Sequence, residues 1–183
     1  MSDPRIARAE GLIRNIPDFP KPGIQFKDIT PLLGDAQGLT DVIDVLAERA
    51  PAGIDAICGV DSRGFIFGAP LAIRLGVGFV PIRKPGKLPA SVIEESFDLE
   101  YGSSTLSMHT DALDAGMRVL LIDDLLATGG TLAASAKLIR RLSAEIAQVQ
   151  VVIELLGLPG RENLARLGIY DCFSLFQVSE APQ

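Results

Sequence analysis

The sequence predicts an α/β protein with a mainly parallel, twisted sheet flanked by helices. Short apolar runs alternate with amphipathic stretches of helical periodicity, as expected for a doubly wound sheet. One of these runs, Val119–Ile122, is apolar throughout, which suits a strand buried on both faces. Of the 183 residues 48% are hydrophobic but only 5% are aromatic, so aliphatic side chains must fill the core. We expect a single domain over residues 1–183.

The N-terminal part is predicted to contain two helices separated by an extended segment. Ser2 or Asp3 can cap a first helix that continues to about Arg14, shortly before two prolines. Gly38–Ala50 has apolar residues at helical spacing and is the second helix, which Pro51 closes. This second helix is expected to cover one face of the sheet.

Four strands and two more helices make up the predicted sheet layer. The strands are Ile54–Val60, Val77–Ile82, Val119–Ile122 and Ile146–Leu156. The helices are Phe65–Leu75, which Gly76 stops, and Thr131–Leu142. This alternation of strands and helices favours parallel strand pairing.

The connection between the second and third predicted strands is unusually long. It has about 35 residues without a convincing helix, whereas ordinary α/β connections have about 2–6. Ser96–Tyr101 and Thr105–His109 can form two short antiparallel strands within it. An insertion of this length is typically a lid or a binding loop.

Residues 119–131, VLLIDDLLATGGT, carry the strongest functional signal. Asp123 and Asp124 should emerge at the carboxyl end of a buried strand, where open α/β sheets bind ligands. The small residues that follow offer free N–H groups and hydroxyls at a helix N-terminus, which suits a phosphate. Two carboxylates would repel a bare phosphate, so the ligand should present hydroxyls or a metal ion, as a ribose 5-phosphate does. The alternative is an ordinary strand-to-helix turn.

Composition excludes several other classes of protein. A net charge of −6 and a pI near 4.8 argue against nucleic-acid binding. No run reaches the roughly 20 apolar residues of a membrane span, and no signal peptide is evident. Cys58 and Cys172 lie far apart without zinc-site spacing, so we expect buried thiols in a reducing cytoplasm. Dinucleotide and P-loop motifs are absent from the sequence, and the single His109 is not expected to be catalytic.

The 119–131 segment resembles the phosphoribosyl-pyrophosphate signature of the type I phosphoribosyltransferases, in which paired acids precede a Thr-Gly-Gly-Thr turn. Further segments are similar to the adenine-specific members of that family, in the same order. They are PGIQFKDITP at 22–31, VDSRGF at 60–65, RKPGKLP at 83–89 and LEYG at 99–102. The resemblance implies the type I phosphoribosyltransferase fold, a small N-terminal hood over 1–35 that binds the base, and a lid over 83–110. It also implies a homodimer.

The activity implied is transfer of the 5-phosphoribosyl group from phosphoribosyl pyrophosphate to adenine, giving AMP and pyrophosphate in purine salvage. Mg²⁺ is the expected cofactor, and the expected partners are these small molecules, with no nucleic acid or membrane. Two alternatives stay open. One is the same chemistry on another purine base, such as hypoxanthine or xanthine. The other is a regulator that senses phosphoribosyl pyrophosphate without turnover.

The phosphate and the ribose are assigned to the 119–131 segment. The residues expected to bind the 5-phosphate are Ala127, Thr128, Gly129, Gly130 and Thr131. Asp123 and Asp124 are suited to the ribose hydroxyls, directly or through metal-bound water, although one of them can instead bind backbone N–H groups. Which of the two contacts the sugar stays open. No direct protein ligand of Mg²⁺ is assigned, because the ion should be held mainly by substrate and water near these acids.

Cations are expected around the leaving pyrophosphate. The residues assigned to it are Asp61, Ser62, Arg63, Arg83, Lys84, Lys87 and Tyr101. Arg63, with Asp123, Asp124 and Glu100, completes the expected catalytic set. Two alternatives are a turn stabilised by an Asp–Arg pair at 61–64 and a solvated basic loop at 83–87.

The resemblance gives Glu100 and Tyr101 a role that the residues alone do not indicate. In the family the corresponding Glu-Tyr pair closes over the ligands, so Glu100 can exchange a proton with the purine as N9 attacks. Without the resemblance, a glutamate on a hairpin would be read as a surface residue.

The base is expected to lie against the N-terminal segment. The residues assigned to adenine are Ile24, Gln25, Phe26, Lys27 and Leu125. Phe26 can stack on the purine with Leu125 on the opposite face, while backbone groups of Ile24 and Gln25 read the base edge. Both apolar residues can instead belong to the core. Lys27 stands where the family often has Arg, so a fork-like contact at this position would become a point charge.

Overall fold

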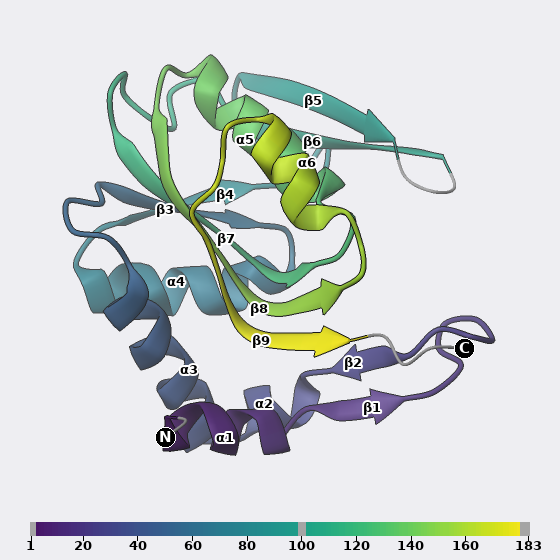
Figure 1. Cartoon of the computed structure of the whole chain (residues 1–183). Coiled ribbons are helices and arrows are strands. Elements are labelled where there is room, and N and C mark those ends of the chain that lie inside the picture. The colour runs from purple at the N-terminus through teal and green to yellow at the C-terminus, as the bar shows by residue number, and fades with distance from the viewer. Residues whose placement is uncertain (1–2, 99–101, 180–183) are drawn as a thin grey trace.

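Five parallel strands form the central sheet, in the order β4–β3–β7–β8–β9 (Figure 1). Their bounds, in that order, are Gly78–Ile82, Ala56–Val60, Arg118–Leu126, Glu145–Leu156 and Cys172–Ser179. All neighbouring strands pair in parallel. The computed structural model describes residues 3–98 and 102–179. The predicted α/β class with a parallel sheet is confirmed.

Helices cover both faces of this sheet. On one face lie α1 (Pro4–Gly11), α2 (Thr30–Gly34), α3 (Ala36–Arg49) and α4 (Arg63–Leu75). On the other lie α5 (Gly130–Arg141) and α6 (Gly160–Arg166). Side chains of a strand point alternately to the two faces, so Leu120 and Ile122 pack against the first group while Val119 and Leu121 pack against the second. Two aliphatic cores therefore hold β7 from both sides.

The order of the strands reverses between β3 and β7. From β3 the chain continues through α4 to β4 at one edge, and from β7 it continues through α5 to β8 and then to β9. The helices that follow β3 and β7 therefore begin at the same edge of the sheet but on opposite faces. Such a switch in direction opens a crevice beyond the carboxyl ends of the strands, where ligands of open α/β sheets bind.

Two small antiparallel sheets flank this carboxyl edge. Strand β1 (Arg14–Ile16) pairs with β2 (Phe26–Asp28), and β5 (Val92–Asp98) pairs with β6 (Ser103–His109). In Figure 1 they extend to the side toward which β8 and β9 point, one below and one above. The crevice thus has an N-terminal wall and a hairpin wall.

The hairpin wall is tied to the rest of the domain at its base. The backbone N–H of Arg83 donates to the carbonyl of Ser107 at 2.9 Å, and the reverse hydrogen bond is 2.7 Å long. Leu106 and Met108 of β6 are buried in the same core as α5. The expected antiparallel pairing is confirmed, although both strands start earlier than predicted, and residues 99–101 lie outside the described part of the chain.

Three sequence expectations about local structure are wrong. The first helix ends at Gly11, not near Arg14, because Arg14–Ile16 pairs with β2. Strand β7 does not end at Ile122 but runs to Leu126, because β8 continues to pair beside it. Cys172 is half-buried where a buried thiol was expected, whereas Cys58 is buried.

The structure also contains elements that the sequence analysis did not predict. Helices α2 and α6 and strand β9 are additions to the predicted set. Asp3 caps α1 as expected, accepting the Arg5 N–H at 2.9 Å.

No helix in residues 3–98 and 102–179 combines the length and apolar character needed to cross a bilayer.

Candidate active site

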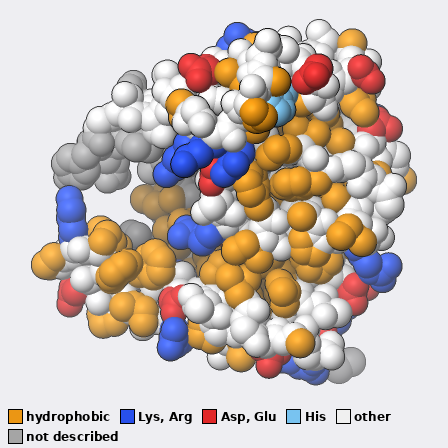
Figure 2. Space-filling view, turned by 180° about the vertical axis from the view of Figure 1, so that it is seen from behind, with side chains coloured by type: hydrophobic (Ala, Val, Ile, Leu, Met, Phe, Trp, Pro, Cys, Tyr) orange, Lys and Arg blue, Asp and Glu red, His pale blue; other side chains and the backbone are white. Residues whose placement is uncertain are grey.

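Three adjoining cavities lie at the carboxyl edge of the sheet, where the strand order reverses. Arg63 and Asp124 line all three of them. Figure 2 shows the hollow on the left of the molecule, with Lys and Arg side chains around it and hydrophobic side chains below. A ligand with chemically different parts can therefore occupy one continuous crevice.

The first cavity is formed by residues 127–131, which connect β7 to α5 and include the first two residues of that helix; we call this segment the 127–131 loop. All five loop residues line it, together with Arg63 and both aspartates. Gly129 precedes α5 with a φ of +83° and provides no side-chain cap, so the first N–H groups of the helix remain available to an anion. The structure thus brings the five residues assigned to the 5-phosphate together around one cavity.

Asp123 and Asp124 form the floor between the cavities. Both are buried, with exposed fractions of 9% and 8%. The Asp123 carboxylate accepts the backbone N–H of Asp124 at 2.9 Å, while the Asp124 carboxylate accepts a hydrogen bond from the Arg63 guanidinium. Burial, reinforced by the charge of Asp124, raises the pKa of Asp123 well above its usual value. The two neighbouring acids therefore have different hydrogen-bond partners, a backbone N–H for Asp123 and a guanidinium for Asp124.

Two arginines from different elements meet acids at this edge. Arg63 is the first residue of α4 and reaches across to Asp124 on β7. Arg83 follows β4 and pairs with Asp61 at 3.1 Å, next to the end of β3. The alternative of a turn held by a pairing of Asp61 with Arg63 is thus replaced by two long-range pairs. The peptide between Asp61 and Ser62 is cis.

The second cavity lies beside these pairs. Its lining residues are Asp61, Ser62, Arg63, Lys84, Asp123, Asp124 and Thr131. Lys87 is exposed, and its carbonyl accepts a hydrogen bond from Arg83 at 3.3 Å. Of the residues assigned to pyrophosphate, Asp61, Ser62, Arg63 and Lys84 therefore line one cavity, and Arg83 and Lys87 lie beside them. Tyr101, like Glu100, lies outside the described residues.

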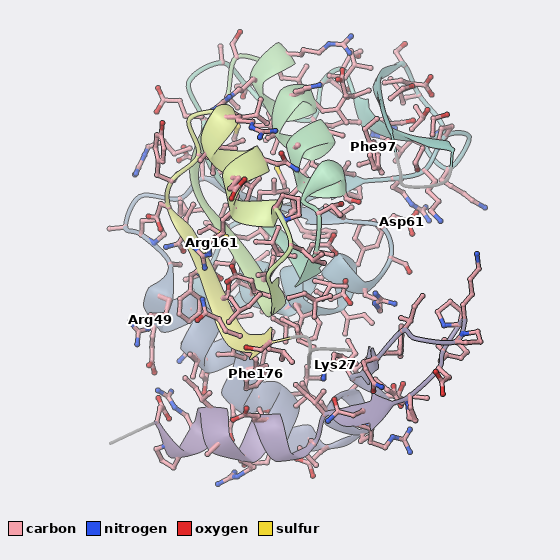
Figure 3. The ribbon with its side chains drawn as sticks, turned by 45° about the vertical axis from the view of Figure 1, so that its right-hand side comes forward. Lys27, Arg49, Asp61, Phe97, Arg161 and Phe176 are labelled. Atoms are coloured by element: carbon pink, nitrogen blue, oxygen red, sulfur yellow. The ribbon has the colours of Figure 1, made fainter. Side chains whose placement is uncertain are left out.

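The third cavity joins the N-terminal segment to the sheet. Its lining combines the five residues assigned to adenine with Arg63, Asp124, Ile153 and Leu155. Phe26 lies on β2 and Leu125 near the end of β7, so segments about a hundred residues apart face one pocket. Lys27 donates to the Asn15 side chain at 2.5 Å, within the β1–β2 pair. Figure 3 shows Lys27 below Asp61 on the right-hand half of the molecule.

Sequence reasoning missed two walls of this pocket. Ile153 and Leu155 lie near the end of β8; Ile153 is paired with Leu125 of β7, and Leu155 is two residues further along the strand. Strand β8 itself was predicted, and the knowledge that it lies next to β7 would have identified both residues. The sequence pattern did not reveal this pairing, because the order of strands in a sheet is not encoded in the local sequence.

The described residues do not include a cluster of three or more His, Cys, Asp or Glu side chains arranged to hold a metal ion. Asp123 and Asp124 are the carboxylates on the floor of the crevice, and their oxygens suit a hard cation. Because Mg²⁺ commonly takes one or two carboxylates and completes its shell with phosphates and water, this donor set fits an ion that arrives with a phosphorylated ligand.

Comparison with known proteins gives the family. The profile of the phosphoribosyl transferase domain matches residues 32–176. The chain is 58% identical over 167 residues to the adenine phosphoribosyltransferase of Roseiflexus castenholzii, which covers 91% of this chain and 95% of the relative.

Solved structures agree with the sequence relatives. The crystal structure of the adenine phosphoribosyltransferase from Thermoanaerobacter pseudethanolicus superposes with a TM-score of 0.89 at 49% identity, covering 94% of this chain and 99% of that one. The enzyme from Saccharomyces cerevisiae, complexed with an imino-altritol bisphosphate and adenine, has a TM-score of 0.86 at 35% identity, with coverage of 94% and 99%. This chain therefore belongs to the phosphoribosyltransferase family and, within it, to the adenine phosphoribosyltransferases.

Proposed function

We propose that the chain transfers the 5-phosphoribosyl group from phosphoribosyl pyrophosphate to adenine, giving AMP and pyrophosphate in purine salvage. The observation that carries this proposal is the meeting of an anion cavity and an apolar pocket at Arg63, Asp124 and Leu125. A nucleoside 5-phosphate has the same order of parts, with a phosphate at one end, a diol in the middle and a flat base at the other. The relative from Saccharomyces cerevisiae holds a bisphosphate and adenine together, which supports the same pairing here.

In the proposed complex the 5-phosphate lies in the 127–131 loop. Backbone N–H groups at the start of α5 and the hydroxyls of Thr128 and Thr131 are its donors. The helix dipole adds a partial positive charge at the same end. Anchoring the phosphate here would fix the ribose over Asp123 and Asp124.

The reaction replaces one bond at the anomeric carbon of the ribose by another. The bond from this carbon to the pyrophosphate oxygen breaks and leaves its electron pair on pyrophosphate, while adenine N9 bonds to the carbon and loses its proton. The sugar becomes cationic in between, and buried carboxylates next to it lower the energy of that state. We assign this stabilisation and the ribose hydroxyls to Asp123 and Asp124, with Arg63 orienting Asp124.

The leaving pyrophosphate needs cations and N–H donors at the opposite side of the ribose. We assign this role to Asp61, Ser62, Arg63, Arg83, Lys84, Lys87 and Tyr101, as the sequence suggested. The clustering of Asp61, Ser62, Arg63 and Lys84 around one cavity supports the assignment. Within it, Asp61 serves indirectly, because its carboxylate holds the Arg83 guanidinium.

Mg²⁺ is the proposed cofactor. It would be held mainly by the phosphates of the substrate and by water, next to Asp123 and Asp124, and when bound it would neutralise charge on the pyrophosphate. The protein's own contribution is to exclude water from the floor of the crevice, where both acids are buried.

Adenine is assigned to the pocket between Phe26 and Leu125. The half-buried Phe26 offers a ring face, and Leu125, Ile153 and Leu155 supply an apolar surface for the base. Backbone groups of Ile24 and Gln25 are the proposed readers of its edge. Lys27 would act as a point charge at the rim of the pocket, where a guanidinium fork is absent.

Glu100 is the proposed acceptor of the N9 proton. The assignment rests on the family resemblance and on the place of Glu100 in the sequence between β5 and β6. Replacing Glu100 by Gln should lower kcat and remove one limb of the pH–rate profile. A variant with the wild-type profile would assign the proton to another group.

The direct test is product formation by the purified protein. With phosphoribosyl pyrophosphate and Mg²⁺, we expect AMP from adenine with a far higher kcat/KM than any nucleotide formed from hypoxanthine or xanthine, and loss of activity after chelation. Preference for another base would refute the adenine assignment. Calorimetric binding of phosphoribosyl pyrophosphate without any product would identify a sensor.

We also propose a homodimer that works in the cytoplasm and binds no nucleic acid. The relationship to the adenine phosphoribosyltransferases supports the homodimer and the location. The net charge of −6 supports the absence of nucleic-acid binding. Light scattering of the purified protein tests the first, and fractionation of source cells tests the location.

A further inference from the structure

The 127–131 loop is supported from behind by the start of α6. Gly129 and Gly160 pack so closely that a Cβ on Gly129 would lie 2.9 Å from the Gly160 carbonyl oxygen. A Cβ on Gly160 would lie 2.4 Å from the carbonyl oxygen of Ala127. Helix α6 follows β8 and does not line the first cavity, so it contacts the loop from the side opposite to the ligand.

One side chain of α6 makes a directed contact with the loop. The Asn163 amide donates to the carbonyl oxygen of Thr128 at 2.7 Å. On its other side, the Asn163 carbonyl oxygen accepts a hydrogen bond from Arg166 at 3.0 Å, which orients the amide with its NH₂ group toward the loop. Nothing in the sequence pattern had marked Asn163.

The orientation of this carbonyl determines the orientation of a neighbouring donor. The peptide between Thr128 and Gly129 is trans, so its C=O and N–H bonds point in opposite directions. With the carbonyl held toward α6, the Gly129 N–H points away from α6, toward the cavity. Within the described residues this N–H makes no hydrogen bond, so it is available to a ligand.

Helix α6 is itself anchored to the sheet through Arg161 (Figure 3). The guanidinium donates to both oxygens of Glu154 at 2.5 and 2.7 Å, and to the Cys172 carbonyl at 2.9 Å. Glu154 is 4% exposed, and its carboxylate also accepts a hydrogen bond from Ser174 at 2.6 Å. A helix of only seven residues is thereby held in one position against β8 and β9.

We propose that Asn163 is a positioning residue for the 5-phosphate, because it fixes the Thr128–Gly129 peptide with the Gly129 N–H turned toward the phosphate. Asn163 does not touch the ligand. The proposal rests on the function proposed above and adds a residue from α6 to the donor-binding machinery. It predicts a loss that is confined to ligands that carry a 5-phosphate.

The test compares AMP with adenosine, which differ only in the phosphate. Calorimetry gives the dissociation constants of both for the wild type, for Asn163→Ala and for Asn163→Leu, which keeps much of the side-chain volume without a donor. We expect AMP to bind about tenfold more weakly to both variants, in keeping with one misplaced donor to a charged group, while adenosine changes less than twofold. The KM for phosphoribosyl pyrophosphate should rise with the AMP dissociation constant, and the KM for adenine should not.

Glu162→Ala is the matched control, since Glu162 is exposed on the same helix next to Asn163. It should bind AMP as the wild type does. Equal weakening of AMP and adenosine in the Asn163 variants would mean general damage to the fold and would overturn the proposal, as would unchanged AMP binding. A wild-type protein that binds AMP no more tightly than adenosine would instead refute the 5-phosphate site itself.

Discussion

The two ends of the crevice are built in different ways. The 127–131 loop is one continuous segment between a buried strand and a helix, and α6 packs tightly behind it. The apolar pocket at the other end combines segments from β2, β7 and β8, and the strands β1 and β2 of its N-terminal wall contain no buried residue. There the ring centroids of Phe26 and Phe19 are 5.1 Å apart in an edge-to-face arrangement, and Phe19 itself is 50% exposed.

This difference predicts a rigid binding site at the phosphate end of the crevice and a more adaptable one at the base end. A loop fixed by backbone contacts can present N–H groups to a phosphate with little reorganisation on binding. The N-terminal wall depends on a β1–β2 pair of three residues per strand and on surface ion pairs such as that of Arg14 with Asp28. We infer that the phosphate end sets where the ligand sits, and that the base end sets which base is accepted.

The largest effect is expected where the two ends meet, at the aspartate pair. Replacing Asp124 by Asn removes the charge opposite the developing sugar cation and leaves Arg63 without its partner, so kcat should fall about 100-fold or more, with less change in substrate binding. Asp123→Asn should also lower kcat more than it weakens binding. Steady-state kinetics with both substrates measure these values.

Asp44→Asn is the control for that experiment. Asp44 also pairs with an arginine, Arg74, at 2.9 Å, but on the outer surface of α3 and α4. Its replacement should leave kcat unchanged. Wild-type kcat in both site variants would remove the aspartates from the proposed mechanism.

The next effect concerns the base end alone. Phe26→Ala removes the proposed stacking surface, so the KM for adenine should rise about tenfold while the KM for phosphoribosyl pyrophosphate stays the same. Phe19→Ala removes only the edge contact with Phe26 and should raise the adenine KM by a few-fold at most. If Phe26→Ala raised both KM values together, the two ends would not act independently.

At the phosphate end, the tight packing of α6 provides the corresponding test. Gly160→Ala would push the Ala127 carbonyl and the loop toward the cavity, so the KM for phosphoribosyl pyrophosphate should rise several-fold, in line with an overpacking cost of roughly 1–3 kcal/mol. Gly34→Ala is the control, because a Cβ there meets nothing within 4 Å. An equal rise in the adenine KM would speak against a local effect.

The smallest effect is on stability in acid. The Arg161 guanidinium lowers the pKa of Glu154 from its usual 4.5 to about 2, so folding favours the ionised carboxylate. Its stabilising contribution is complete above pH 4.5 and is lost as the pH falls toward 2. Glu154→Gln should therefore lose less stability than the wild type over that range, as followed by thermal unfolding at several pH values. Parallel curves for the two proteins would exclude this linkage.

The sequence predicted the parts of the fold that depend on local pattern. The strand around Val119–Ile122, the helix stopped by Gly76 and the gathering of residues 127–131 at one site follow from periodicity and turn chemistry. Strand β1 did not, because three residues beginning with Arg14 become a strand only through pairing with β2.

Partners that are distant in sequence were also beyond prediction. Arg63 and Asp124 are 61 positions apart, and Arg83 and Asp61 are 22 apart. Which acid meets which arginine depends on strand order, and so does the contact between Asn163 and Thr128. Residue types and spacing indicated that acids and arginines gather at this edge, but they did not show which acid pairs with which arginine.

The central claim is that the 127–131 loop holds the 5-phosphate while Phe26 and Leu125 enclose the base. A crystal structure with bound AMP tests both parts at once. We predict the phosphate within hydrogen-bond distance of the N–H groups of residues 129–131, and the adenine ring between the side chains of Phe26 and Leu125. A phosphate bound elsewhere, with the loop closed by its own side chains, would contradict the account.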